Sequence, residues 1–289
     1  MKRFTILAAT VLTALSLSAQ QIELTLESVL DGTFSTVGAG PVTPLSDGEH
    51  YLTSKNGTLI LKHSFKTGQV TDTILNLNNV RGERLFMFDG FILSPTEDII
   101  LLQTRTRRIY RRSFTADYYI FTIRNNKIEP LTAGGPIQVP SFSPDGHNIA
   151  FVRDNNIFIV KLLFGNAEVQ VTKDGEPGKI LNRIPDWAYE EEFMVTRAYE
   201  FSADSRMLAW IKFDESNVES YTLPFFITRT ERDAYSQKLL TGRQQQYPTA
   251  GAVNSKVSVQ SFDIKSSVIR DMDLKSLDRK SGSAGMPRP

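Results

Sequence analysis

The apolar residues of this chain fall into short runs that are separated by tight turns. Residues 118–123 and 156–162 are rich in β-branched and aromatic side chains, and residues 257–264 alternate between apolar and polar positions. These patterns are typical of β-strands, whereas no long stretch repeats with the period of a helix. We therefore predict an all-β chain.

One turn-and-strand unit recurs along the sequence. Its clearest copies begin at Ser143 and Ser202, and looser copies begin at Ser94 and Ser46, so these serines are 48, 49 and 59 residues apart. Ser and Asp side chains bond back to the backbone of such a turn, and Gly accepts its positive φ. A repeat of about fifty residues with several short strands is the signature of β-propeller blades. We predict blades of four-stranded antiparallel sheets, about five of them if one starts near residue 250, which would make an incomplete propeller.

The two ends of the chain differ from its middle. Lys2 and Arg3 precede a short apolar stretch that closes on small residues, so we expect residues 1–19 to be an export signal, with an uncleaved anchor as the alternative. Export would take the protein to the periplasm, the cell surface or the medium. Residues 275–289 are polar and rich in Gly and Pro, which predicts a disordered tail or an altered reading frame. Residues 20–274 remain as the partial propeller.

Composition excludes several kinds of site. The chain has no cysteine, and its three histidines, His50, His63 and His147, lack ligand spacing, so we predict no metal and no organic cofactor. The formal net charge is +1, and it becomes −1 if Lys2 and Arg3 are removed with the signal. This balance argues against nucleic acid as a partner, because no basic stripe is available to hold phosphates.

Residues 186–193, Asp-Trp-Ala-Tyr-Glu-Glu-Glu-Phe, form the most distinctive segment. Three adjacent carboxylates normally form a solvated charge run, which is one interpretation of Glu190, Glu191 and Glu192. The octet lies, however, in the 59-residue interval, which is about ten residues longer than the others. Insertions in repeat folds map to a loop on one face, often the binding face. Carboxylates between aromatic side chains in such a loop suit the capture of a cation.

Four segments resemble the dipeptidyl peptidase IV family of the prolyl oligopeptidase clan, most of all its secreted enzymes from Bacteroidetes-type bacteria. The octet is similar to the double-glutamate motif of that family, with Ala188 where Val is usual. Residues 110–116 resemble its arginine segment, and residues 142–157 resemble one of its blades. Residues 247–251 resemble its Tyr-Pro-Lys-Ala-Gly segment, with Thr in place of Lys. The likeness runs in order from about residue 25 to about residue 265.

The resemblance implies a serine aminodipeptidase, which removes a dipeptide from a free peptide N-terminus, usually when the second residue is Pro or Ala. Carried over by position, it implies that Glu191 and Glu192 bind the α-ammonium of the substrate and that Arg111 binds the carbonyl of its second residue. Arg112 stands where the family often has His and is the weaker candidate. Family members are commonly dimeric, so a homodimer is a further expectation.

The catalytic part of such an enzyme is not apparent in the sequence. It contains no Gly-x-Ser-x-Gly elbow, and no histidine follows His147, so a Ser-Asp-His triad cannot be assembled from it. We therefore expect the propeller portion of a peptidase without its α/β-hydrolase domain, with no catalytic residue and no hydrolysis by this chain alone. Two alternatives remain open: a non-catalytic propeller used as an interaction or scaffold module, and a fragment whose open sheet edge prevents stable folding.

Overall fold

The computed structural model describes residues 23–36, 40–182, 184–222 and 244–273. The chain divides into two compact units, Met1–Pro41 and Val42–Pro289. The predicted export signal and the predicted tail lie outside the described residues. Within the first unit, helix α2 (Leu26–Leu30) begins at a capping box, in which the backbone N–H groups of Ser28 and Thr25 each donate to the other residue's hydroxyl.

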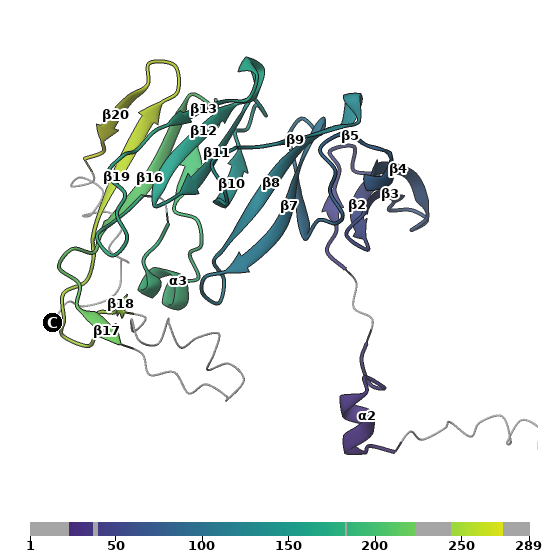
Figure 1. Ribbon diagram of the computed structural model, residues 1–289, viewed down its shortest axis with the longest axis horizontal. Coiled ribbons are helices and arrows are strands. Elements are labelled where there is room, and N and C mark those ends of the chain that lie inside the picture. Colours follow the sequence, from purple (N-terminus) through teal and green to yellow (C-terminus); the bar gives the residue numbers. More distant parts are fainter. Residues whose placement is uncertain (1–22, 37–39, 183, 223–243, 274–289) are drawn as a thin grey trace, which may run out of the picture. The chain divides into compact units, whose positions relative to one another are not determined.

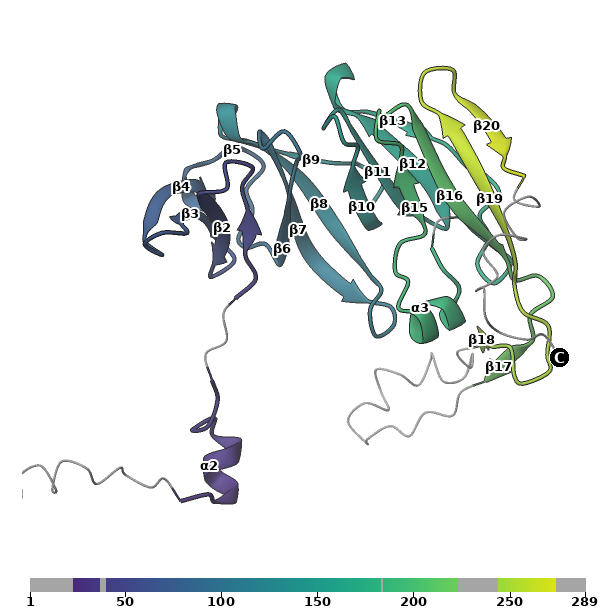
Figure 2. The same ribbon diagram turned by 180° about the vertical axis from the view of Figure 1, so that it is seen from behind.

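The described residues of the second unit form four sheets of four or five strands, which lie side by side in chain order (Figures 1 and 2). The first two sheets hold β1 (Thr43–Pro44), β2 (His50–Lys55), β3 (Leu59–Ser64) and β4 (Val70–Asn76), then β5 (Arg81–Gly82), β6 (Gly90–Leu93), β7 (Ile99–Arg108), β8 (Phe114–Thr122) and β9 (Lys127–Pro130). Within them only β5 and β9 pair in parallel.

The third and fourth sheets follow the same antiparallel plan. They hold β10 (Gln138–Phe142), β11 (Asn148–Arg153), β12 (Asn156–Lys161) and β13 (Ala167–Gln170), then β14 (Ile180–Asn182), β15 (Tyr199–Phe201), β16 (Met207–Asp214), β19 (Lys256–Asp263) and β20 (Val268–Asp271). A separate ribbon pairs β17 (Ser220–Thr222) with β18 (Gln244–Gln246). Three short 3-10 turns complete the described elements: η1 (Leu77–Asn79), η2 (Ile123–Asn125) and η3 (Leu162–Phe164).

The predictions of an all-β chain and of four-stranded antiparallel sheets are confirmed. The expectation that a further blade begins near residue 250 differs from what is found. Strand β19 pairs along the whole length of β16, so this stretch completes the fourth sheet, and with β20 it forms the edge of that sheet. The repeat markers could not reveal this pairing, because it joins strands that are about fifty residues apart and leaves no local pattern.

The middle sheets are buried on both faces, which explains the runs of adjacent apolar residues in the first half of β7 and in β11 and β12. In β7, Leu101 packs with the third sheet, whereas its neighbours Ile100 and Leu102 pack with the first. In β11, Phe151 packs toward the second sheet and Ala150 toward the fourth. Successive side chains of a strand point to opposite faces of its sheet. A strand in a sheet that lies between two other sheets therefore needs apolar residues on both faces.

The recurring serine turns also connect neighbouring sheets. The Ser143 hydroxyl accepts the Asn148 N–H at 2.9 Å and donates to Asp145, and Ser202 makes the same pair of bonds to Met207 and Asp204. Each turn then contacts the next one along the chain. These contacts are Ser46 N–H to Glu97 at 2.5 Å, Thr96 against Gly146, and Asp145 N–H to the Ser205 hydroxyl at 2.9 Å.

The helices of the described residues are few and short. None of them is both long enough and apolar enough to cross a membrane.

Candidate functional site

The acidic octet lies in an excursion that interrupts the first strand of the fourth sheet. Strand β14 pairs with the Lys212–Asp214 end of β16, and β15 pairs with its Leu208–Trp210 end. Between the two, the chain leaves the sheet, forms helix α3 (Trp187–Phe193), and returns to the same partner strand. The insertion inferred from the repeat spacing is therefore present, but it carries a short helix where a loop was expected.

Local sequence explains why this helix begins and ends where it does. The Asp186 carboxylate caps the N-terminus by accepting the Tyr189 N–H at 2.8 Å, and it also accepts the Ser255 hydroxyl. Met194 ends the helix in the left-handed conformation. The Tyr189 ring packs edge-on against Phe213 of β16, 5.1 Å between centroids, and so holds the helix to its own sheet.

Glu190, the first of the three adjacent glutamates, is the buried one. The residue is only 1% exposed. Its Oε1 accepts hydrogen bonds from the backbone N–H groups of Ser113 at 2.8 Å and Arg112 at 3.2 Å. These donors lie in the loop between β7 and β8, 77 and 78 residues away in sequence. The Glu190 carboxylate therefore joins the hairpin loop of the second sheet to the helix of the fourth.

The three residues implied to bind substrate lie on the two sides of this junction. Arg111 is in the β7–β8 loop and is exposed, while Glu191 is half-buried and Glu192 exposed on α3. Arg112 connects the two sides: its Nη1 donates to the Glu190 carbonyl at 3.3 Å and lies 3.6 Å from Glu191 Oε2. The arginine segment and the double-glutamate segment are thus neighbours, although no contact between Arg111 and either glutamate is recorded.

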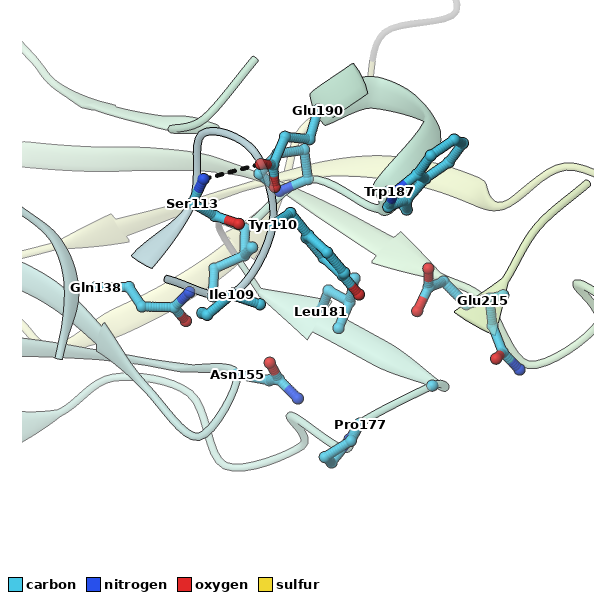
Figure 3. A pocket seen from close by; sticks show the side chains of 14 residues that line it. Ile109, Tyr110, Ser113, Gln138, Asn155, Pro177, Leu181, Trp187, Glu190 and Glu215 are labelled. Carbon is cyan, nitrogen blue, oxygen red and sulfur yellow. Dashed lines mark hydrogen bonds between the residues drawn. The ribbon is translucent and has the colours of Figure 1, made fainter. Parts of the chain in front are cut away.

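A pocket of about 270 Å³ lies beside this junction (Figure 3). Tyr110 and Trp187 contribute aromatic rings to its lining, and Glu190 and Glu215 contribute carboxyl groups. Trp187 packs in turn against Tyr247, with 4.9 Å between ring centroids. Neither Arg111 nor the other two glutamates of α3 belong to this lining, so the pocket is distinct from the three residues implied to bind substrate.

Glu215 stands at the end of β16 and is the second buried carboxyl group of the pocket. The residue is 6% exposed, and no described residue donates a hydrogen bond to its side chain. Burial, together with the nearby charge of Asp186, raises the pKa of Glu215 to about 7. The group therefore changes its charge near neutral pH, whereas an exposed glutamate is ionised throughout that range.

Comparison with known sequences identifies the family. The profile described as Dipeptidyl peptidase IV (DPP IV) N-terminal region matches residues 94–283, about two thirds of the chain. The chain belongs to the dipeptidyl peptidase IV family. The match includes both the β7–β8 loop and helix α3, so the junction built by Glu190 lies within the family region.

Curated relatives and a solved structure agree with the family. The chain is 30% identical over 251 residues to a probable dipeptidyl peptidase 4 of Aspergillus fumigatus, covering 85% of this chain and 31% of the relative. It is 34% identical over 200 residues to a probable dipeptidyl-aminopeptidase B of Coccidioides posadasii, covering 67% and 22%. The crystal structure of Porphyromonas gingivalis dipeptidyl peptidase 4 superposes with a TM-score of 0.78 and 34% identity, covering 88% of this chain and 35% of that one.

These relatives confirm the resemblance and the propeller-type fold inferred from the sequence. The chain spans about a third of the length of the relatives it matches, or less. Within the dipeptidyl peptidase IV family region, sequence reasoning found the arginine and glutamate segments but missed Glu190 as their connection, and it missed Glu215 altogether. An aspartate three residues before Tyr189 is a recognisable helix N-cap, and it was the available signal that the octet is helical.

Proposed function

We propose that this chain recognises the free N-terminus of peptides as the binding part of a dipeptidyl peptidase. In this proposal Glu191 and Glu192 bind the α-ammonium group, and Arg111 donates to the carbonyl oxygen of the second residue. The names of the relatives, which are dipeptidyl peptidases and dipeptidyl-aminopeptidases, support this substrate class.

The observation that carries the proposal is the Glu190 junction. Its two hydrogen bonds hold the loop of Arg111 against the helix of Glu191 and Glu192, although these segments are almost eighty residues apart. A peptide N-terminus presents an ammonium group and carbonyl oxygens at short, fixed separations. A junction that fixes a cationic loop beside an anionic helix suits a ligand of this kind, because neither side has to be ordered at the moment of binding.

The chemistry of the three residues fits their proposed partners. An ammonium group has three donors, and its hydrogen bonds to carboxylates belong to the stronger, charge-assisted class. Two carboxylates also favour the protonated amine, whose pKa is otherwise about 7.7–8.0. A peptide held by its terminus presents one bond at a fixed distance from the anchor, which is how a binding site can select the length of the fragment to be released. These residues bind and align; none of them is assigned a step in bond cleavage.

The direct test compares a peptide that has a free N-terminus and Pro or Ala second with the same peptide acetylated at its amine. Isothermal titration calorimetry should detect weak binding of the free peptide and none of the acetylated one. Replacing Glu191 and Glu192 by Gln should remove that binding, whereas Glu200→Gln on the exposed side of β15 should not change it. Equal binding of free and acetylated peptides would contradict the proposal and would favour a scaffold role for this propeller.

We also propose that the protein is exported, on the strength of residues 1–19 alone. Expression of the whole gene should then yield a mature chain that begins at Gln20, which mass spectrometry of the purified protein can establish. A chain that retains Met1 in the cytoplasm would overturn this part of the proposal.

A further inference from the structure

The pocket next to the Glu190 junction has the composition of a cation site. Its lining contains two carboxyl groups, Glu190 and Glu215, and no lysine, arginine or histidine among the described residues. Asp186 adds a third carboxyl group nearby, whose charge acts on Glu215. Lys179, whose carbonyl accepts the Glu215 N–H at 2.7 Å, has its own ammonium group paired with Glu176 at 2.6 Å. The described residues thus give the pocket negative charge and no cation.

Glu215 separates this pocket from an ordinary acidic patch. Both glutamates are buried. The carboxylate of Glu190 accepts hydrogen bonds from two backbone N–H groups, whereas the carboxyl group of Glu215 accepts none from the described residues. Figure 3 shows its carboxyl group directed into the space between Tyr110, Leu181 and Trp187. A buried carboxyl group costs free energy unless a hydrogen-bond donor or a cation pairs with it. The carboxyl oxygens of Glu215 face the pocket, so such a partner would have to come from there.

We propose that this pocket binds one ammonium or guanidinium group of side-chain size, with Glu215 as its counter-ion and the rings of Trp187 and Tyr110 beside it. Aromatic faces attract such cations. The volume of about 270 Å³ is below the usual range for whole drug-sized ligands, so it fits the end of a lysine or arginine side chain better than a folded ligand. A single free carboxyl group also offers too few oxygen ligands for Ca²⁺ or Mg²⁺.

This second cation site does not depend on the proposed binding of peptide termini. Glu191 and Glu192 lie outside the pocket lining, so variants of those residues and of Glu215 can be examined separately. The two sites are adjacent, because Tyr110 precedes Arg111 in the loop and Glu190 precedes Glu191 in the helix. A peptide anchored at one site would therefore lie close to the other.

The probes are n-butylguanidinium and n-butylammonium, with n-butylurea as the neutral counterpart of the former. Binding can be followed by the fluorescence of Trp187, because the other tryptophan, Trp210, is enclosed in the core between the third and fourth sheets. We expect dissociation constants on the order of 1–10 mM for the cations, as suits ligands of few atoms, and binding at least about tenfold weaker for n-butylurea. Comparison of the two cations tells which group fits better.

Three variants decide the result. Glu215→Gln keeps the size of the side chain and should weaken binding of the cations at least about tenfold, while the exposed neighbour Glu219→Gln should leave it unchanged. The Glu191→Gln, Glu192→Gln double variant should still change the fluorescence of Trp187 on binding n-butylguanidinium, even if it no longer binds peptide termini; n-butylammonium is left out of this comparison, because it carries the primary ammonium group that Glu191 and Glu192 are proposed to bind. A thermal melt establishes that each variant is folded. Unchanged cation binding by Glu215→Gln, or n-butylurea binding as tightly as n-butylguanidinium, would overturn the proposal.

Discussion

Two glutamates line the same pocket and are almost equally buried, yet the protein treats them differently. Glu190 projects from a helix toward a loop of another sheet, where two backbone N–H groups converge on one of its oxygens. Glu215 projects from the end of a strand into the pocket, where no described residue donates to its carboxyl group, and burial raises its pKa to about 7. The carboxylate of Glu190 stabilises the contact between the loop and the helix, whereas no described residue forms a hydrogen bond with that of Glu215. Burial alone therefore does not tell whether an acidic residue contributes to stability or to binding; its donors do.

The largest effect is expected from Glu190→Ala. This change leaves the buried N–H groups of Arg112 and Ser113 without an acceptor, and each such loss costs about 1–3 kcal/mol, so we expect the free energy of unfolding to fall by about 3 kcal/mol. Urea denaturation followed by circular dichroism measures this. Glu190→Gln should cost much less, because both bonds end on Oε1 and an amide oxygen can accept them. A loss of similar size in Glu192→Ala, which is exposed, would show that the effect is not specific to the junction.

Glu215→Gln should have the opposite sign. The folded-state pKa of Glu215 lies above that of an unfolded glutamate, so the parent protein loses stability as the pH rises from about 4.5 through 7. Removing the ionisable group should therefore stabilise the protein by about 2 kcal/mol at pH 8, after a discount for water in the pocket, and by almost nothing at pH 4. Denaturation of parent and variant at both values of pH gives the difference. A variant less stable than the parent at pH 8 would mean that Glu215 has a stabilising partner.

A smaller effect is expected from Arg112→Ala. Its guanidinium group makes one bond to the Glu190 carbonyl and one loose ion pair with Glu191, at the boundary of solvent, so the loss should be about 1 kcal/mol or less. The part of this loss that comes from the ion pair should shrink in 1 M NaCl, because salt screens exposed charges. If Arg112→Ala were as damaging as Glu190→Ala, the side chain and not the backbone of the loop would be the main connection.

The smallest effect is expected from Ser113→Ala. The backbone N–H of Ser113 bonds to Glu190, but its buried hydroxyl has no partner among the described residues. Removing an unsatisfied hydroxyl should change the free energy of unfolding by no more than about 0.5 kcal/mol, with a gain as the expected direction. A loss above about 1 kcal/mol in the same urea experiment would show that the hydroxyl is bonded after all.

The sequence predicted what depends on neighbours along the chain. The serine turns, the apolar strands and the extra length before Ser202 are all local patterns, and each led to a feature that the structure contains. It could not predict that β19 joins β16, since strand pairing across the β17–β18 ribbon leaves no trace in either segment. The same limit applied to Glu190. Three identical residues in a row differ only in the direction that a helix gives each side chain, and the donors that make Glu190 special come from residues 112 and 113.

The interrupted first strand of the fourth sheet has an evolutionary consequence. Because β14 and β15 both pair with one continuous strand, the excursion between them is fixed at each end by the ladder of β16. An insertion or deletion in that excursion would be absorbed outside the sheet and would not shift the register of any strand. Natural variation could therefore lengthen, shorten or rewrite the segment that carries helix α3 while the blade beneath it stays the same.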